Sequence, residues 1–290
     1  LRGHRPVIYE RSDRLGGAFI AAAAESYKGK LRDLLAWYRR QMDVLGVEIN
    51  YNYEVRTLQE FPDLPVIIAT GAVPRILRGV KGHEKMIEAC DFLLGEPGAK
   101  EAAGTTAEGS PTGRPADPAH TGSVPTFGET AASIGSGPAL GETAAVTVRT
   151  PALGETVAVI GGGLTGCEIA YELELQGKKP VIVEMLDDLI KQKGVCLANS
   201  SYLREYFAWK KVPVYLNTRL TEVKDGSIIC EDQDGKAFEI PCDSVISCAG
   251  YLSAPIASDG RKNVQLIGDC HSVGNLRTVI WGAYEAAMII

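Results

Sequence analysis

Three glycines and a glutamate near the middle of the chain have the spacing of a nucleotide-binding turn. Gly161, Gly163 and Gly166 form the pattern G-x-G-x-x-G directly after an apolar run at 157–160. In this pattern the first glycine permits a tight turn, the second lets a pyrophosphate approach the backbone, and the third lets a helix pack close to the strand. Glu184 follows about 20 residues later, where a carboxylate can bind the 2′-hydroxyl of a ribose.

The elements around these residues are the ones that such a turn requires. The run at 157–160 is short enough for a buried strand, a helical pattern covers 164–176, and a second apolar run covers 180–183. The free N–H groups and the positive dipole end of the helix would face the phosphates. We therefore predict a strand–turn–helix–strand unit that binds a dinucleotide. The alternative is a glycine-rich connection in a parallel sheet that binds nothing.

A second acid near the start of the chain repeats part of this pattern. Residues 6–10 form an apolar run that ends in Glu10, as 180–184 ends in Glu184. Glu10 is therefore predicted to be the ribose-binding acid of another dinucleotide unit, whose first strand and glycine loop would lie upstream of Leu1. On this interpretation the chain is a piece cut inside its first β-α-β unit. In the alternative interpretation, Glu10 simply ends a strand.

The other periodic segments predict an α/β protein. Helical periodicity covers 28–45, 200–211 and 276–290, while strand-like runs bounded by glycine or proline alternate with these helices. Turns at Asp225-Gly226 and Asp234-Gly235 divide 218–241 into a β-meander. The predicted single strands cover 47–50, 65–71, 212–216, 243–249 and 264–269.

Residues 96–154 differ in composition from the rest of the chain. Gly, Ala, Thr, Pro and Glu dominate, and a Gly-Glu-Thr repeat recurs at 128–130, 141–143 and 154–156. Such a composition buries too little apolar surface to offset the entropy of ordering. We predict a flexible low-complexity insertion.

The overall composition excludes several classes of function. The net charge of −6 disfavours a nucleic-acid partner or an anionic membrane surface, and no apolar run is long enough to span a membrane. Seven cysteines are scattered without a close pair, and the four histidines form no metal-like pair. We therefore predict free thiols in a reducing cytoplasm and no metal site.

Five motifs together resemble one family. The chain is similar to flavoprotein reductases of the pyridine nucleotide–disulfide oxidoreductase superfamily. Within it, the chain most resembles the C-terminal part of the old-yellow-enzyme-like NADH:flavin oxidoreductases, which include 2,4-dienoyl-CoA reductase, trimethylamine dehydrogenase and bile-acid enoate reductases. The motifs are VIYERSDRLGG at 7–17, IIATGAVP at 67–74, VAVIGGGLTGCEIA at 157–170, VIVEM at 181–185 and VQLIGDC at 264–270.

The resemblance implies two Rossmann-like domains and a set of cofactor-binding residues. An NAD(P)-binding domain at 155–249 would be inserted into an N-terminally truncated FAD-binding domain at 1–95 and 250–290. Glu168 would lie near the nicotinamide as a candidate catalytic residue, although in the first turn of the helix it can equally serve the helix dipole. The residues implied for NAD(H) are Gly161, Gly162, Gly163, Leu164, Thr165, Gly166 and Glu184, and those implied for FAD are Glu10, Leu15, Gly16, Gly17, Ala69, Thr70, Gly71, Gly250, Gly268 and Asp269.

The function implied is hydride transfer from NADH to FAD. NADH is expected over NADPH, because Glu184 would repel a 2′-phosphate. The resemblance further implies that electrons pass to a missing N-terminal barrel domain, with FMN and an iron–sulfur cluster, that acts on an enoate or similar substrate. Three alternatives stay open: an ADP-binding module without catalysis, a disulfide reductase, and a degenerate fragment that binds nothing. Whether the chain forms a homo-oligomer also stays open.

Overall fold

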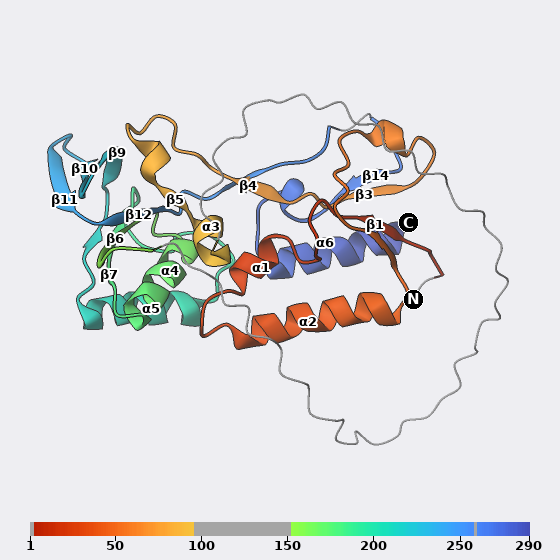
Figure 1. Ribbon diagram of the computed structural model, residues 1–290, viewed down its shortest axis with the longest axis horizontal. Helices are drawn as coiled ribbons and strands as arrows, with labels where there is room; N and C mark the ends of the chain where they lie inside the picture. The colour runs from red at the N-terminus through yellow and green to blue at the C-terminus, as the bar shows by residue number, and fades with distance from the viewer. Residues whose placement is uncertain (1–2, 96–151, 258–259) are drawn as a thin grey trace, which may run out of the picture. The chain divides into compact units, whose positions relative to one another are not determined.

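The computed structural model describes residues 3–95, 152–257 and 260–290 and has mixed α/β architecture (Figure 1). This confirms the predicted α/β class. The predicted insertion at 96–154 lies outside the described residues except for its last three positions. The helices are α1 (Ala18–Ala22), α2 (Gly29–Val44), α3 (Ala89–Leu94), α4 (Leu164–Leu175), α5 (Leu197–Lys210) and α6 (Leu276–Ile289). The strands are β1 (Val7–Tyr9), β2 (Glu48–Asn50), β3 (Val66–Ile68), β4 (Ala72–Pro74), β5 (Ile87–Glu88), β6 (Thr156–Ile160), β7 (Lys179–Val183), β8 (Val214–Tyr215), β9 (Arg219–Lys224), β10 (Ser227–Glu231), β11 (Ala237–Pro241), β12 (Ser244–Ser247), β13 (Tyr251–Ser253) and β14 (Val264–Leu266).

The largest sheet is parallel and has the order β5-β12-β6-β7-β8. Its central strand β6 is buried on both faces, which is why its sequence is almost continuously apolar. Val157 and Val159 pack in one hydrophobic core, and Ala158 and Ile160 pack in another on the opposite face.

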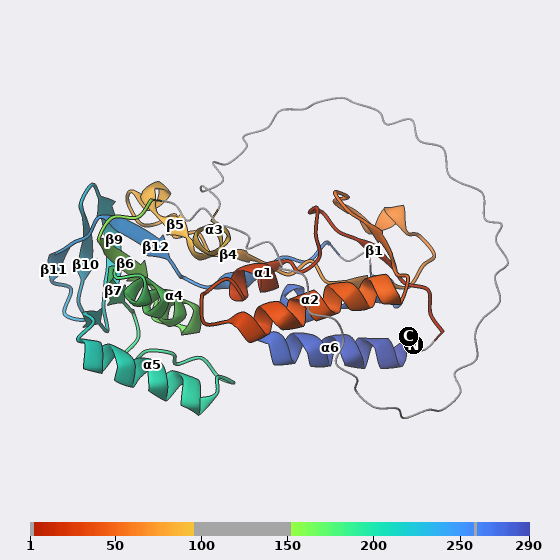
Figure 2. The same cartoon turned by 60° about the horizontal axis from the view of Figure 1, so that its bottom comes forward.

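Helices cover one face of this sheet and a small antiparallel sheet covers the other. α4 and α5 contribute Ile169, Leu173, Leu203 and Phe207 to the first core and lie together beside β6 and β7 (Figure 1, Figure 2). The second core is completed by β9, β10 and β11, which form the predicted meander. The strand–turn–helix–strand unit is therefore sandwiched in the best-packed part of the described chain.

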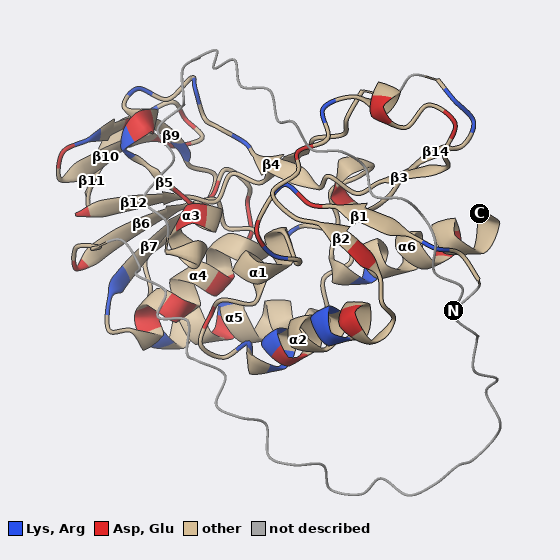
Figure 3. Ribbon diagram, turned by 45° about the vertical axis from the view of Figure 1, so that its right-hand side comes forward, with Lys and Arg blue, Asp and Glu red and all other residues tan. Residues whose placement is uncertain are grey.

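The remaining described strands form three short pairs. β1 pairs with β2 and β14 pairs with β3, both in parallel, while β13 and β4 form an antiparallel pair. Leu58, Ile68 and Cys270 make a separate small core beside β3. Acidic and basic residues alternate along the ribbon of α2, in keeping with a solvated helix face (Figure 3).

The predicted domain boundary near residue 95 falls just after two elements, β5 and α3. Residues 87–94 form β5 and α3, and β5 pairs with β12 in the five-stranded sheet, although these residues precede position 95. The division into 1–95 with 250–290, 96–154 and 155–249 therefore stays a prediction. Among the described residues, no helix combines the length and the apolarity needed to cross a membrane.

Candidate dinucleotide-binding site

Two of the three motif glycines are required by packing. Gly161 directly follows β6 and has a φ of 106°, a conformation that favours glycine, and a Cβ at this position would collide with the carbonyl of Cys248. A Cβ at Gly166 would collide with the carbonyl oxygen of Gly161. The strand, the turn and α4 can approach each other this closely only because both residues lack a side chain.

Gly163 is different, because no such collision explains it. Its φ of −68° suits any residue, and an added Cβ would meet only the Gln192 side chain, with Oε1 at 3.2 Å. The first intrahelical bond of α4 runs from Cys167 N–H to the Gly163 carbonyl at 2.9 Å, so the N–H groups of Leu164, Thr165 and Gly166 have no acceptor within the helix, and that of Leu164 donates to Gln192. Within 4 Å, an added Cβ at Gly163 would meet no backbone atom from elsewhere in the fold.

Glu184 lies at the end of β7 and is 9% exposed. Its carboxylate accepts the Gly162 N–H at 2.5 Å on Oε2 and the Leu186 N–H at 2.8 Å on Oε1. The side chain therefore ties the second strand end to the glycine turn. Each carboxylate oxygen can accept more than one hydrogen bond, so Glu184 could accept a ribose hydroxyl in addition to these two N–H groups.

The loop after Glu184 contributes residues that the sequence patterns did not indicate. Ile190 donates its N–H to the Gly162 carbonyl at 2.8 Å, and its φ of 50° is rare for a β-branched residue. Gln192 then accepts the Leu164 N–H on Oε1 at 3.2 Å. A lone glutamine in a loop carries no recognisable spacing, so no sequence signal could have indicated it.

Glu168 has a partner from a distant segment. Lys28 Nζ lies 2.8 Å from Glu168 Oε2 and 3.0 Å from Glu25 Oε1, so one ammonium joins two carboxylates. Glu25 is 2% exposed, and its other oxygen has no hydrogen-bond partner among the described residues. Burial raises the pKa of Glu25, against the attraction of Lys28, which lowers it.

Two half-buried thiols, Cys90 and Cys248, bear on the disulfide-reductase alternative. Cys90 and Cys248 follow β5 and β12 at the carboxyl edge of the parallel sheet, and the Cys90 Sγ lies 3.2 Å from the Tyr251 hydroxyl. Burial raises the pKa of both thiols, so they stay protonated near neutral pH and are poor nucleophiles. Glu88 lies on the same edge, and burial raises its pKa to about 7, with repulsion by Asp91 adding to the effect.

The predicted FAD residues at the start of the chain form a compact turn. Glu10 follows β1 and accepts both the N–H and the hydroxyl of Ser12 at 2.8 Å. Arg39 on α2 donates from Nε at 2.9 Å to the Leu15 carbonyl. Gly16 and Gly17 then lead into α1 with φ values of 130° and 47°.

The FAD candidates later in the chain follow the carboxyl ends of two paired strands, β3 and β14. Leu266 of β14 is in register with Ile68 of β3, so Ala69, Thr70 and Gly71 emerge beside Gly268 and Asp269. The Thr70 hydroxyl donates to the Ala254 carbonyl at 2.7 Å, and Asp269 Oδ1 accepts the Gly274 N–H at 3.0 Å. Gly250, farther along the fold, accepts the Arg75 N–H at 2.9 Å. The structure therefore gathers some of these residues and leaves Glu10 on a separate strand pair.

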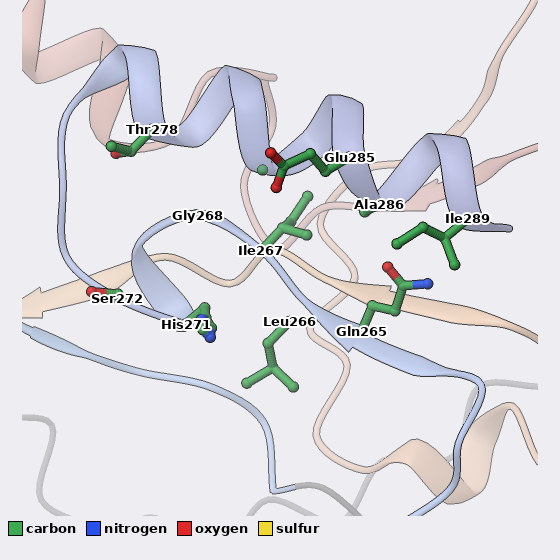
Figure 4. Close-up of a pocket in the computed structure, with 11 residues that line it drawn as sticks. Gln265, Leu266, Ile267, Gly268, His271, Ser272, Thr278, Glu285, Ala286 and Ile289 are labelled. Carbon is green, nitrogen blue, oxygen red and sulfur yellow. The ribbon is translucent and has the colours of Figure 1, made fainter.

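A pocket of about 320 Å³ lies between β14 and α6 (Figure 4). Gly268 lines it together with His271, Glu285 and Ala286. Its lining joins one predicted FAD residue to the face of the last helix. No group of three or more His, Cys, Asp or Glu among the described residues could hold a metal ion.

A family model described as pyridine nucleotide-disulphide oxidoreductase matches residues 46–266, well over half of the chain. The chain belongs to this family. Its members are FAD-dependent NAD(P)H oxidoreductases that bind FAD and NAD(P)H, which confirms the predicted enzyme class and cofactors. The glycine turn, α4 and Glu184 all lie within the matched range.

Individual relatives are consistent with the family. A cinnamate reductase of Clostridium sporogenes is 29% identical over 99% of this chain and 36% of its own length. An NADH oxidase of Thermoanaerobacter brockii is 24% identical over 99% of this chain and 37% of its own length. A 2-naphthoyl-CoA reductase structure, solved with 2-naphthoyl-CoA, covers the whole chain with a TM-score of 0.71 at 20% identity and 36% of its own length, and shows the shared fold. The chain thus spans little more than a third of these relatives.

Proposed function

We propose that this chain moves a hydride from NADH to FAD, with NADH at residues 155–249 and FAD at 1–95 and 250–290. The observation that supports the NADH site is the contrast among the glycines. A Cβ at Gly161 or Gly166 would collide with a backbone carbonyl, whereas a Cβ at Gly163 would meet only the Gln192 side chain, and an approaching phosphate would account for this glycine. Gly162, Leu164 and Thr165 complete the turn that would surround the pyrophosphate, and Glu184 would accept the ribose hydroxyl.

The residues proposed to contact FAD are spread over more segments of the chain than those proposed to contact NADH. Glu10 would accept hydroxyls of the adenosine ribose and Asp269 those of the ribityl chain, because carboxylates accept strongly from sugar hydroxyls. The residues assigned to line the flavin are Leu15, Gly16, Gly17, Ala69, Thr70, Gly71, Gly250 and Gly268.

Hydride transfer between the two cofactors requires few catalytic side chains. When bound, the nicotinamide supplies a hydride and the flavin accepts it. The chain must hold the two rings in register and exclude water, and no side-chain acid or base is needed for the transfer itself. Glu168 is the fifth residue of α4, beyond the predicted first turn, and is paired with Lys28; it is proposed to orient the nicotinamide.

Electrons are proposed to pass to another domain of a longer protein. The support is the small share of the relatives that this chain spans, together with the name of the cinnamate reductase. An enoate or similar substrate, with FMN and an iron–sulfur cluster in that domain, forms part of the proposal.

The test is anaerobic mixing of the intact protein with NADH while the visible flavin absorbance is followed. We expect rapid bleaching in the natural protein, and Gly163→Ala should weaken NADH binding about tenfold or more through lost phosphate hydrogen bonds. Gly79→Ala is the matched control, because Gly79 is exposed and an added Cβ meets nothing within 4 Å. NADH binding without bleaching would point to a non-catalytic nucleotide module, and unchanged binding in Gly163→Ala would refute the phosphate assignment.

A further inference from the structure

The side chain of Gln192 lies where a bound phosphate would lie. Its Oε1 accepts the Leu164 N–H at 3.2 Å, at the first residue of α4. The same oxygen is 3.2 Å from the position that a Cβ on Gly163 would take. A carboxamide oxygen and a phosphate oxygen are both acceptors, so they cannot use this N–H and this space at the same time.

The loop that carries Gln192 is fastened on several sides. Arg204 of α5 forms two hydrogen bonds to the Asp188 carboxylate, from Nε at 3.1 Å and from Nη2 at 3.0 Å. Ile190 is buried in the core and donates its N–H to the Gly162 carbonyl at 2.8 Å. Gln192 itself is exposed, two residues after this anchor.

The anchoring explains why the loop backbone stays in place while one side chain can leave. Asp188 and Ile190 fix the loop against α5 and the glycine turn, so its backbone holds Gln192 close to the start of α4. Among the described residues, the Gln192 carboxamide bonds to Leu164 alone, and the residue is exposed, so rotation about its side-chain bonds is sufficient to release it.

We propose that Gln192 is a displaceable plug of the dinucleotide site, which sets its affinity for ligands that carry a pyrophosphate. This inference rests on the proposed nucleotide site. In the free protein the carboxamide satisfies the Leu164 N–H, and a ligand phosphate replaces it there. The apparent affinity then equals the intrinsic affinity multiplied by the fraction of molecules in which the plug is out, so it falls as the plugged fraction rises.

The expected size of the effect follows from one neutral hydrogen bond. Such a bond favours the plugged form enough to lower the apparent affinity about two- to tenfold. Gln192→Ala removes the acceptor and should tighten binding by that factor. Gln192→Glu keeps the shape and the acceptor, but its negative charge is favoured at the helix start and repels phosphate, so binding should weaken about tenfold or more.

The experiment is calorimetric titration of the intact protein with ADP-ribose, which carries a pyrophosphate but cannot reduce a flavin. Adenosine, which lacks phosphate, is the control ligand, and its affinity should be the same in all variants. Gln59→Ala is the control variant, because this exposed glutamine lies in the 3₁₀ turn Leu58–Glu60 of another part of the fold.

Opposite shifts in Gln192→Ala and Gln192→Glu, seen with ADP-ribose alone, are the expected result. Equal affinity of Gln192→Ala and the natural protein overturns the plug, as does weaker binding in Gln192→Ala, which would make Gln192 a direct phosphate ligand. Failure of the natural protein to bind ADP-ribose would instead refute the proposed nucleotide site. Thermal unfolding of each variant separates a loss of binding from a loss of folding.

Discussion

Glu184 is the residue whose local structure and proposed chemistry are most closely joined. Its carboxylate holds the Gly162 and Leu186 N–H groups, so truncation to alanine would disturb the turn as well as the charge. Glu184→Gln keeps the size and one oxygen acceptor while removing the charge that would repel a 2′-phosphate. We expect the ratio of kcat/KM for NADPH over NADH to rise about tenfold, a difference of about 1.4 kcal/mol.

Steady-state kinetics of the intact protein with the two nucleotides measures this ratio. Asp187→Asn is the matched control, because Asp187 is an exposed acid in the same loop and pairs with Lys191 rather than with the glycine turn. An unchanged ratio in Glu184→Gln would show that this carboxylate is structural and does not select the ribose.

Glu25 should make folding stability depend on pH. Its pKa is raised chiefly by burial, with Glu168 adding to the rise and Lys28 opposing it. An acid with a raised pKa in the folded state binds its proton more tightly there. Its contribution to stability is therefore complete below the unfolded pKa of about 4.3 and is lost as the pH rises through the folded pKa.

Glu25→Gln should remove this dependence. We expect the variant to gain stability relative to the natural protein as the pH rises from about 4 toward neutrality, because the glutamine never has to lose a proton. Urea unfolding at a series of pH values measures the difference. Glu205→Gln, an exposed acid on α5, is the control. Parallel pH curves for Glu25→Gln and the natural protein would contradict the prediction.

At the scale of elements, the sequence predicted the bounds of the most deeply buried strands and helix most accurately. The predicted strand at 157–160, helix at 164–176 and strand at 180–183 differ by only one residue at one end each from β6, α4 and β7. These elements are buried in the two cores on either face of the sheet, and glycines follow β6 and α4 closely, so local pattern and tertiary packing agree. The predicted strand at 65–71 is shorter in the structure, where β3 covers Val66–Ile68.

The reason for that shortening is a contact that no local pattern contains. The Thr70 hydroxyl and the Gly71 carbonyl both bond to Ala254, so the backbone turns away from β14 and toward the β4–β13 pair. The same limit applies to the candidate site. Motif spacing indicated the glycines and Glu184, whereas Lys28 and Gln192 reach α4 only through the tertiary fold.

For the described molecule as a whole, one segment fastens the first helices to the nucleotide-binding unit. Ser26 donates its N–H at 3.0 Å and its hydroxyl at 2.8 Å to Glu172 Oε2 on α4. Tyr27 packs edge-on against Tyr171, with ring centroids 5.1 Å apart. Together with the Lys28–Glu168 ion pair, these contacts join the α1–α2 connection to the helix that begins at the glycine turn. Glu172 is buried, so its two bonds to Ser26 are shielded from water.

Glu172→Ala should therefore destabilise the protein by about 2–3 kcal/mol, because it removes both hydrogen bonds that the buried Glu172 carboxylate accepts from Ser26. Urea unfolding measures the loss, and hydrogen exchange should become faster in residues 23–28 while the glycine turn keeps its protection. Glu174→Ala on the same helix is the matched control, since Glu174 is less buried than Glu172 and its partners, Lys210 and Tyr206, both lie on α5 and not in the α1–α2 connection. If the two variants proved equally stable, the Ser26–Glu172 contact would not be what holds the first helices against α4.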